Sequence, residues 1–272
     1  MVIEFTKMSG AGNDFVVIDN RDGKISDAPG TARKLCDRHN GIGADGLLLL
    51  ETSQSASYRM MYYNADGSYG GMCGNGGRCI SAFAVEAGIA SEKHDFMALE
   101  HVYRAEVAGN RVRLSMKDPK NVQKSVVLPI GKKRLTVFSV DTGSPHVVME
   151  AKKLTRRGLE SVDVEGLGST IRHHRKFNPA GTNVNFVEIN GANSLKIRTY
   201  ERGVEAETMA CGTGSIAAAV YGVLMEGLGL PVRVMPKSGQ EIAVDFVLKG
   251  EEIANVSLSG PAVVVFRGSV EI

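Results

Sequence analysis

The sequence predicts an α+β fold made of two homologous halves, and two observations carry this prediction. Many short runs of alternating or β-branched residues are separated by Gly, Asn, Asp or Ser, which is the pattern of strands and turns. Two similar Cys-Gly-x-Gly segments each precede an apolar helix. The expected strands are Phe15–Asp19, Leu47–Leu50, Tyr58–Tyr63, Arg111–Met116, Leu135–Val140, Asn185–Ile189, Leu195–Tyr200, Val232–Met235, Ile242–Val247, Val256–Leu258 and Ala262–Phe266.

Only two long stretches have the composition of buried helices, Gly77–Ala90 and Ser215–Glu226. Both are apolar on nearly every face, so we expect other structure to surround each of them. Each half should therefore consist of several strands around one central helix.

The two halves repeat the same features in the same order. Cys73 and Cys211 stand 138 positions apart, and the segments that begin at Gly43 and Gly181 have the same offset. Tyr63-Asn64 and Tyr200-Glu201 each close a strand 137 positions apart, and the segments at Gly12 and Gly143 are 131 apart. A constant order at nearly constant spacing indicates an internal duplication.

Pro and charged residues interrupt the strand pattern at Lys117–Lys120. We therefore expect an N-terminal half at residues 1–118 and a C-terminal half at residues 119–256. The last segment, residues 257–272, has no counterpart in the second repeat and is expected to return to the first half.

Composition excludes several classes of protein. The chain has 272 residues, and 32 Lys and Arg nearly balance 30 Asp and Glu, so we expect no nucleic-acid partner. The longest apolar stretch, Ile216–Met225, is half of a membrane span, and the N-terminus does not resemble a signal peptide. Four cysteines in a chain of this length do not form a disulfide scaffold. We expect a cytoplasmic protein with no membrane partner.

Cys73 and Cys211 each stand directly before a predicted helix. Unsatisfied backbone N–H groups at a helix start favour the thiolate and lower the pKa of a thiol. The glycines beside each cysteine allow those N–H groups to bind a carboxylate. If the halves face each other, one thiolate can remove an α-hydrogen while the other thiol returns a proton from the opposite side. This scheme requires neither a metal ion nor a cofactor, and we expect none.

For other cysteines and glycines, a structural role fits better than a metal site or a dinucleotide site. Cys36 and Cys79 are expected to be core residues, and Cys79 lies on a different helix face from Cys73, which argues against a zinc site. Gly10-Ala11-Gly12 lacks the third glycine and the following long helix of a dinucleotide site.

Motifs along nearly the whole chain resemble the diaminopimelate epimerase family. They are Phe5-Thr6-Lys7-Met8, Gly10–Phe15, Gly43–Gly46, Asn64–Ser68, Met72–Gly76, Thr182-Asn183, Tyr200–Gly203, Ala210–Gly214 and Ser259–Ala262. The resemblance implies two pseudo-twofold domains, each a mixed barrel-like sheet around a central helix, with the active site in the cleft between them. It also implies a cofactor-independent interconversion of LL- and meso-2,6-diaminopimelate in bacterial-type lysine biosynthesis, and a homodimer with Phe266 as a candidate contact.

The resemblance also assigns roles to individual residues. Cys73 and Cys211 match the two catalytic bases, and His146 and Glu201 match the groups that tune the two thiols. The residues that match the substrate-binding set are Asn13, Asn64, Gly74, Asn75, Ser144, Asn183, Glu201, Arg202, Gly212 and Thr213.

Two positions depart from the family pattern. Ser144 stands where many members have Asn, and Gly46 stands where some have Gln. Two alternative functions stay open: a related two-cysteine racemase or epimerase for proline or hydroxyproline, and a non-catalytic binding protein with the same fold. Arg202 argues against the first, because a cyclic imino acid has no charged far end.

Overall fold

The computed structural model describes residues 1–271, and within them the chain folds into two units, each compact in itself. The first unit holds Met1–Ser115 and the described residues from Ser259 onward, and the second holds Met116–Leu258. Each unit combines a mixed set of strands with two α-helices. The predicted α+β class with two homologous halves is confirmed.

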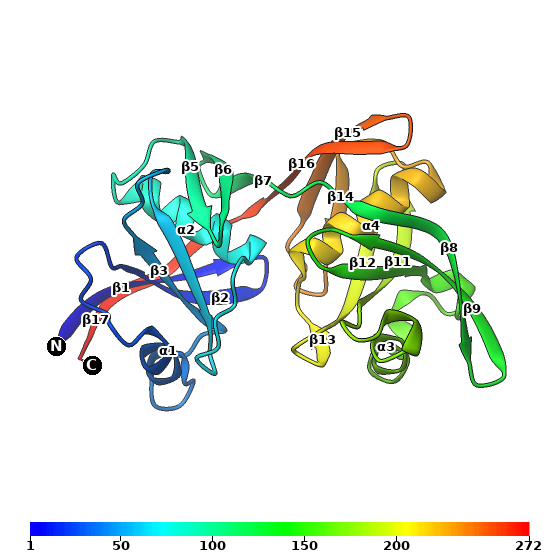
Figure 1. Cartoon of the computed structure of the whole chain (residues 1–272), viewed down its shortest axis with the longest axis horizontal. Coiled ribbons are helices and arrows are strands. Elements are labelled where there is room, and N and C mark those ends of the chain that lie inside the picture. The colour runs from blue at the N-terminus through cyan, green and yellow to red at the C-terminus, as the bar shows by residue number, and fades with distance from the viewer. Residues whose placement is uncertain (272) are drawn as a thin grey trace. The chain divides into compact units, whose positions relative to one another are not determined.

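The first unit is a mixed sheet that wraps around the helix α2 (Gly74–Glu86), which packs against most of its strands (Figure 1). The helix α1 (Ala28–Cys36) packs against β3 and β4. Pairing is parallel between β2 and β3 and between β4 and β5, and it is antiparallel elsewhere in the series. The strands in order of pairing are β17 (Val263–Glu271), β1 (Val2–Gly10), β2 (Asn13–Asp19), β3 (Gly46–Glu51), β4 (Arg59–Asn64), β5 (Lys93–Ala98), β6 (His101–Ala108) and β7 (Arg111–Ser115).

The second unit has the same plan around α4 (Gly212–Glu226), with α3 (Val164–Arg172) packed on β11 and β12. Its paired strands are β8 (Lys120–Ile130), β9 (Lys133–Asp141), β10 (Pro145–Glu150), β11 (Asn183–Gly191), β12 (Ser194–Glu201), β14 (Val232–Met235) and β15 (Ile242–Lys249). β13 (Ala206–Thr208) also pairs with β12, and β16 (Glu252–Pro261) runs from the second unit into the first. Short 3₁₀ turns lie at Ala151–Lys153, Leu159–Ser161 and Arg175–Phe177.

The pairing pattern demonstrates the duplication. In the first unit the hairpin β1–β2 is followed by parallel β3, antiparallel β4, parallel β5 and antiparallel β6. In the second unit β9–β10 is followed in the same senses by β11, β12, β14 and β15. The helices α2 and α4 occupy equivalent places in this series: α2 lies between β4 and β5, and α4 lies between β12 and β14, after the short strand β13.

Both central helices begin three residues earlier than predicted. Gly74 and Gly212 are the first helical residues, so each cysteine is itself the N-cap, with extended backbone. Glycine has weak helix propensity, which is why the sequence placed both starts after the glycines. At the other end, α4 stops at Gly227, whose φ of 70° is the left-handed conformation that ends many helices.

The short helices α1 and α3 were not predicted. Each has nine residues, and an aspartate caps each start: Asp27 accepts a hydrogen bond from the Gly30 N–H and Asp163 accepts one from the Gly166 N–H, both at 2.9 Å. These local caps, rather than a long apolar face, fix where the two helices begin.

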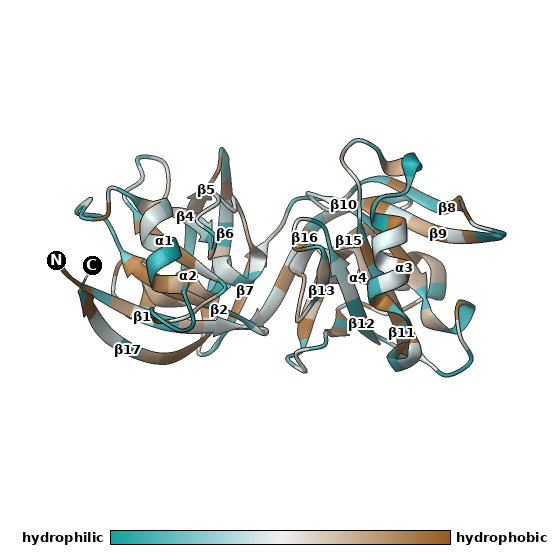
Figure 2. Ribbon diagram, turned by 90° about the horizontal axis from the view of Figure 1, so that it is seen from below, coloured by the Kyte–Doolittle hydropathy of each residue, from teal (hydrophilic) through white to brown (hydrophobic). Residues whose placement is uncertain are grey.

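Each unit has its own core of buried residues, and hydrophobic segments are brown in both units in Figure 2. In the first unit, Val16, Leu47 and Leu49 are fully buried in a cluster with residues of α1. In the second, Val147, Val184 and Phe186 pack with Ile171 of α3. No helix within residues 1–271 is long and apolar enough to cross a membrane.

Replacing the cap of α3 tests its contribution to stability. Asp163→Ala removes the acceptor for the Gly166 N–H and should lower the free energy of unfolding by about 1 kcal/mol. Asp163→Asn keeps a capping oxygen and should stay close to the parent protein in urea denaturation. Equal losses in the two variants would contradict a capping role.

Candidate active site

Cys73 lies at the N-terminus of α2, with the first-turn amides of that helix next to it. Its φ of −121° and ψ of 123° are extended, and its carbonyl accepts the Gly77 N–H at 2.7 Å. The amides of the first helical turn have no partner within the helix. A β-carbon on Gly76 would come within 3.1 Å of the Leu48 side chain, so glycine lets this turn pack closely against the sheet. The first unit thus joins a half-buried thiol to a set of backbone donors.

Cys211 repeats this arrangement at the start of α4. Its backbone has nearly the same angles, −122° and 115°, and its sulfur accepts the Gly214 N–H at 3.4 Å. A β-carbon on Gly214 would lie 2.6 Å from Asn185 Oδ1 and 3.3 Å from the sulfur. The site therefore requires glycine at this position.

Glu201 contacts Cys211 directly. Its carboxylate accepts a hydrogen bond from the Cys211 thiol and another from Thr208 Oγ1 at 2.9 Å. Burial raises the pKa of Glu201, while both hydrogen bonds oppose that shift. A carboxylate that accepts this hydrogen bond stabilises the protonated thiol of Cys211.

His146 is fully buried beside the same helix start. Its Nε2 lies 3.0 Å from both Ser144 Oγ and Thr213 Oγ1, and Thr213 Oγ1 lies 3.5 Å from the Cys211 sulfur. Burial lowers the pKa of His146 to about 3, and the positive charge of Arg202 adds to the effect. The imidazole is therefore neutral at physiological pH. The two predicted tuning residues, His146 and Glu201, both lie in the second unit with Cys211.

Asn183 and Arg202 form one edge of this region. The Asn183 amide donates to Pro145 O at 3.0 Å and to Ser144 Oγ at 3.2 Å, and its oxygen accepts the Arg202 backbone N–H at 2.8 Å. The Arg202 guanidinium donates to Ala180 O at 3.1 Å. No carboxylate of residues 1–271 lies within ion-pair distance of it, so it can bind a carboxylate ligand.

In the first unit, the side chains of Asn13 and Asn75 are hydrogen-bonded to each other. Asn75 Nδ2 donates to Asn13 Oδ1 at 2.6 Å, and Asn13 Nδ2 donates to Asp45 at 2.9 Å. The Arg78 guanidinium donates a hydrogen bond to Asn75 Oδ1 at 2.8 Å. This arginine is fully buried in α2, and burial lowers its pKa to about 10. Asn13 and Arg78 thus fix the Asn75 amide at the helix start, next to Cys73.

Asn64 occupies a separate turn at the end of β4. It pairs in register with Gly46, donates to Ser68 Oγ and accepts a hydrogen bond from the Tyr62 hydroxyl at 2.7 Å. A β-carbon on Gly46 would lie 2.5 Å from the Tyr62 ring. The Tyr62 ring therefore fills the place that a side chain at position 46 would need.

Several residues that shape the site were missed by sequence reasoning. Asn185, Thr142 and Thr208 surround the Cys211 end of α4, and Arg78 and Tyr62 hold the asparagines of the first unit. Only Asn185 carried a usable signal, because it stands two positions after Asn183 in a strand and so shares its face.

The other two cysteines are core residues, as predicted. Cys36 and Cys79 are buried, and burial raises the pKa of each thiol to about 12. None of the four cysteines forms a disulfide. In the described part of the chain, no group of three His, Cys, Asp or Glu could hold a metal ion.

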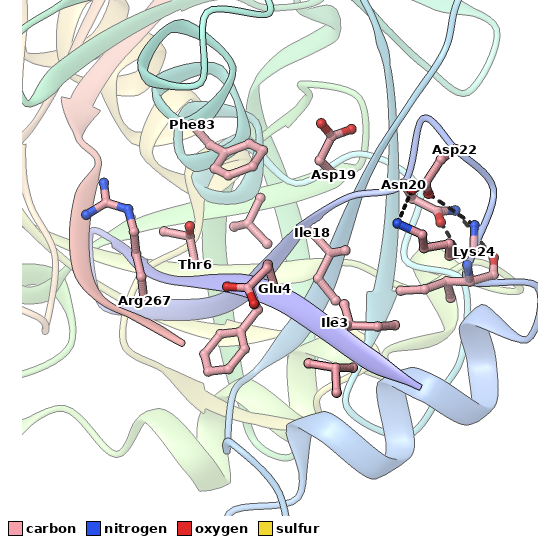
Figure 3. Close-up of a pocket in the computed structure, with 14 residues that line it drawn as sticks. Ile3, Glu4, Thr6, Ile18, Asp19, Asn20, Asp22, Lys24, Phe83 and Arg267 are labelled. Carbon is pink, nitrogen blue, oxygen red and sulfur yellow. Dashed lines mark hydrogen bonds and ion pairs between the residues drawn. The ribbon is translucent and has the colours of Figure 1, made fainter. Parts of the chain in front are cut away.

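A cavity of about 260 Å³ in the first unit lies away from these residues. Glu4 and Thr6 of β1, Phe83 of α2 and Arg267 of β17 line it (Figure 3). None of the predicted site residues is among the described residues that surround it. It therefore does not mark the candidate site.

Comparison with known proteins identifies relatives that match nearly the whole chain. Diaminopimelate epimerase of Chlorobaculum tepidum is 46% identical over 97% of this chain and 99% of its own length. The enzyme of that name from Aquifex aeolicus is 40% identical over 98% of this chain and 97% of its own length.

Solved structures share the fold at much lower identity. A PhzF-family phenazine biosynthesis protein of Bacillus anthracis superposes with a TM-score of 0.72 at 15% identity, covering 100% of both chains. A probable proline racemase of Agrobacterium radiobacter gives 0.70 at 14%, covering 99% of this chain and 92% of its own. The sequence model of the family described as diaminopimelate epimerase matches residues 5–132 and 138–265, one match in each half. The chain belongs to the diaminopimelate epimerase family.

Proposed function

We propose that this isomerase interconverts LL- and meso-2,6-diaminopimelate in bacterial-type lysine biosynthesis. The observation that carries the proposal is the presence of a cysteine N-cap at the start of both equivalent central helices. Family membership supplies the substrate: the relatives that cover nearly the whole chain are named diaminopimelate epimerase.

In the proposed reaction Cys73 and Cys211 act on one α-carbon from opposite sides. One thiolate takes the α-proton, and the C–H electron pair moves into the adjacent carboxylate to give an enediolate-like species. The other thiol then protonates the carbon on its opposite face, so one S–H bond forms and the other breaks. The reverse direction exchanges the roles of the two sulfurs.

Backbone amides at both helix starts stabilise the charge that develops. We assign Gly74, Asn75, Gly212 and Thr213 to the reacting carboxylate. Donors fixed in place before the reaction stabilise a developing oxyanion without reorganising. This stabilisation replaces the electron sink of a cofactor, and we propose that the enzyme needs neither cofactor nor metal ion.

The rest of the substrate needs groups for a second ammonium and a second carboxylate. Arg202 suits the carboxylate, because its guanidinium offers a bidentate donor pair. Asn13, Asn64, Asn183 and Ser144 supply the neutral donors and acceptors, with Glu201 as the acidic member of the set. An acyclic substrate with a charged far end fits these groups.

Glu201 and His146 have complementary effects on Cys211. Glu201 accepts a hydrogen bond from the thiol and so supports the acid form of Cys211 before proton delivery. His146 is neutral and positions a hydroxyl beside the sulfur. The thiol form of Cys211 thus has the Glu201 carboxylate as its partner, and the thiolate form has the Thr213 hydroxyl.

We propose further that the enzyme is a cytoplasmic homodimer without membrane or nucleic-acid partners. The exposed apolar residues of β17 support a contact between copies, because Val265 and Phe266 are 56% and 46% exposed. Part of this strand is brown, the colour of hydrophobic residues, in Figure 2. Phe266 packs edge-on against Phe5 in the same unit, so its exposed ring is held in place.

A proline-type racemase is the alternative within the same fold. Its support is the likeness to the Agrobacterium protein, which at 14% identity concerns the fold alone. A non-catalytic binding protein would have no use for a thiol at both helix starts. The epimerase is therefore the function that the site supports best.

Serine at either catalytic cysteine should reduce epimerisation of diaminopimelate by about 10²- to 10⁴-fold, the usual contribution of a general acid or base. A hydroxyl is too weak an acid to replace a thiol in this step. The measurement is stereoisomer conversion, together with deuterium incorporation at the α-carbon in heavy water, for Cys73→Ser and Cys211→Ser.

Cys36→Ala is the control, because this thiol is buried outside the candidate site. If either serine variant keeps most of its activity, the two-base scheme is wrong. Deuterium that enters only proline would support the alternative racemase, and none in any amino acid would support the binding protein.

Arg202→Ala should raise KM for diaminopimelate by about 10- to 100-fold, since a charge-assisted hydrogen bond is worth roughly 1.5–3 kcal/mol. The value of kcat should change less, because the distal carboxylate takes no part in proton transfer. Arg175→Ala removes an exposed arginine of the same unit and should leave KM unchanged. An unaltered KM in the Arg202 variant would remove this residue from the site.

The neutral state of His146 makes stability depend on pH. Its pKa is about 3 in the folded protein and 6.5 when unperturbed, so the unfolded chain binds the extra proton between these values. The contribution of His146 to stability is full above pH 6.5 and is lost as pH falls toward 3, by about 2 kcal/mol between pH 7.5 and 5.

Urea denaturation of the parent protein and His146→Gln at these two pH values measures the effect. The variant should lose less stability on acidification than the parent. Identical losses would show that His146 is already protonated in the folded protein at pH 5.

A further inference from the structure

The Asn185 amide is held in one orientation. Asn185 is fully buried in β11, where its Nδ2 donates to Val147 O at 2.9 Å and its Oδ1 accepts the Thr199 hydroxyl at 3.0 Å. A backbone carbonyl can only accept, so the NH₂ group must face Val147. The second hydrogen of that NH₂ group is left for another acceptor.

That acceptor is the His146 ring. Asn185 Nδ2 lies 3.1 Å from His146 Nδ1, which must therefore carry no proton. Burial keeps the imidazole neutral, with a pKa of about 3. A neutral imidazole whose Nδ1 is bare carries its single proton on Nε2.

The proton on Nε2 decides which way the neighbouring hydroxyl points. Thr213 Oγ1 has two side-chain neighbours at its polar end, His146 Nε2 at 3.0 Å and the Cys211 sulfur at 3.5 Å. A protonated Nε2 cannot accept, so the Thr213 hydroxyl hydrogen goes to the sulfur. Asn183 Nδ2 also lies 3.4 Å from His146 Nε2, but its two hydrogens have nearer acceptors, Pro145 O at 3.0 Å and Ser144 Oγ at 3.2 Å.

We propose that Asn185 is a positioning residue that fixes the Nε2–H tautomer of His146 and thereby directs the Thr213 hydroxyl at the Cys211 sulfur. With the Gly214 N–H at 3.4 Å, the sulfur then has two donors, which favour its thiolate. The inference rests on the proposed function only in that Cys211 must alternate between thiol and thiolate.

Two charged side chains, Glu201 and Arg202, also affect the protonation of Cys211 and His146. Glu201, at the end of β12, accepts the Cys211 thiol hydrogen and opposes the thiolate. Arg202 follows it, and its positive charge adds to the effect of burial, which lowers the pKa of His146. Asn185 is uncharged, so replacing it changes hydrogen-bond polarity without adding or removing charge.

The tautomer can be read directly in the substrate-free parent protein. Nitrogen-15 NMR of the histidine-labelled enzyme should give the His146 signal of a neutral Nε2–H imidazole at pH 7, with assignment by comparison with His146→Gln. A neutral Nδ1–H ring or an imidazolium would overturn the inference. This measurement needs no variant of Asn185 to fold.

The effect on sulfur is tested with Asn185→Leu, which keeps the approximate shape and removes the donor to His146. Peptide-resolved alkylation by iodoacetamide across a pH series should move the midpoint for Cys211 upward by about 0.5–1 unit, the equivalent of one hydrogen bond. Cys73, in the other unit, is the internal control and should keep its midpoint.

Thr199→Val is the matched control variant. It removes the hydroxyl on the other side of the same amide, while Val147 O still fixes the NH₂ group, so the midpoint for Cys211 should stay at the parent value. Equal shifts in the two variants would assign Asn185 a purely structural role. Neither readout uses diaminopimelate, so a failed epimerase assay would leave this test intact.

Discussion

The unsatisfied amides at the start of a buried helix are the constraint on which both halves of this protein depend. In each unit the sheet surrounds one central helix, and a cysteine caps that helix where its first-turn N–H groups lack internal partners. Glycines follow the cysteine because the helix start packs too closely for side chains: Gly76 meets Leu48, and Gly214 meets Asn185. Close packing of each helix start thus requires glycine within the same turn whose amides we propose to bind the reacting carboxylate.

Around this shared element the two units have diverged. The Cys211 thiol contacts the Glu201 carboxylate and the Thr213 hydroxyl, and the neutral imidazole of His146 contacts that hydroxyl in turn. In the first unit, by contrast, Arg78 and Asn13 hold Asn75 in place. Duplication therefore preserved the fold and the position of the thiol, while the side chains around each helix start differ between the two units.

Local signals in the sequence were enough to predict the two central helices and the position of a cysteine before each of them. Apolar composition and Gly-rich helix starts are properties of contiguous residues. The short helices α1 and α3 escaped prediction, since each depends on one aspartate cap rather than on a long pattern. The supporting residues escaped for another reason. Tyr62 acts through the pairing of β4 with β3, and Arg78 is buried although arginine is usually exposed.

The pairing of β17 with β1 has a consequence for how the polypeptide matures. Val2 stands opposite Glu271 and Thr6 opposite Arg267, so β1 waits for a partner that is translated after the whole second unit. The second unit is contiguous, from Met116 to Leu258, and can assemble while β1 still has one open edge. Until β17 is made, that edge of β1 has no partner, and an unpaired strand edge is a site at which another chain can add a strand.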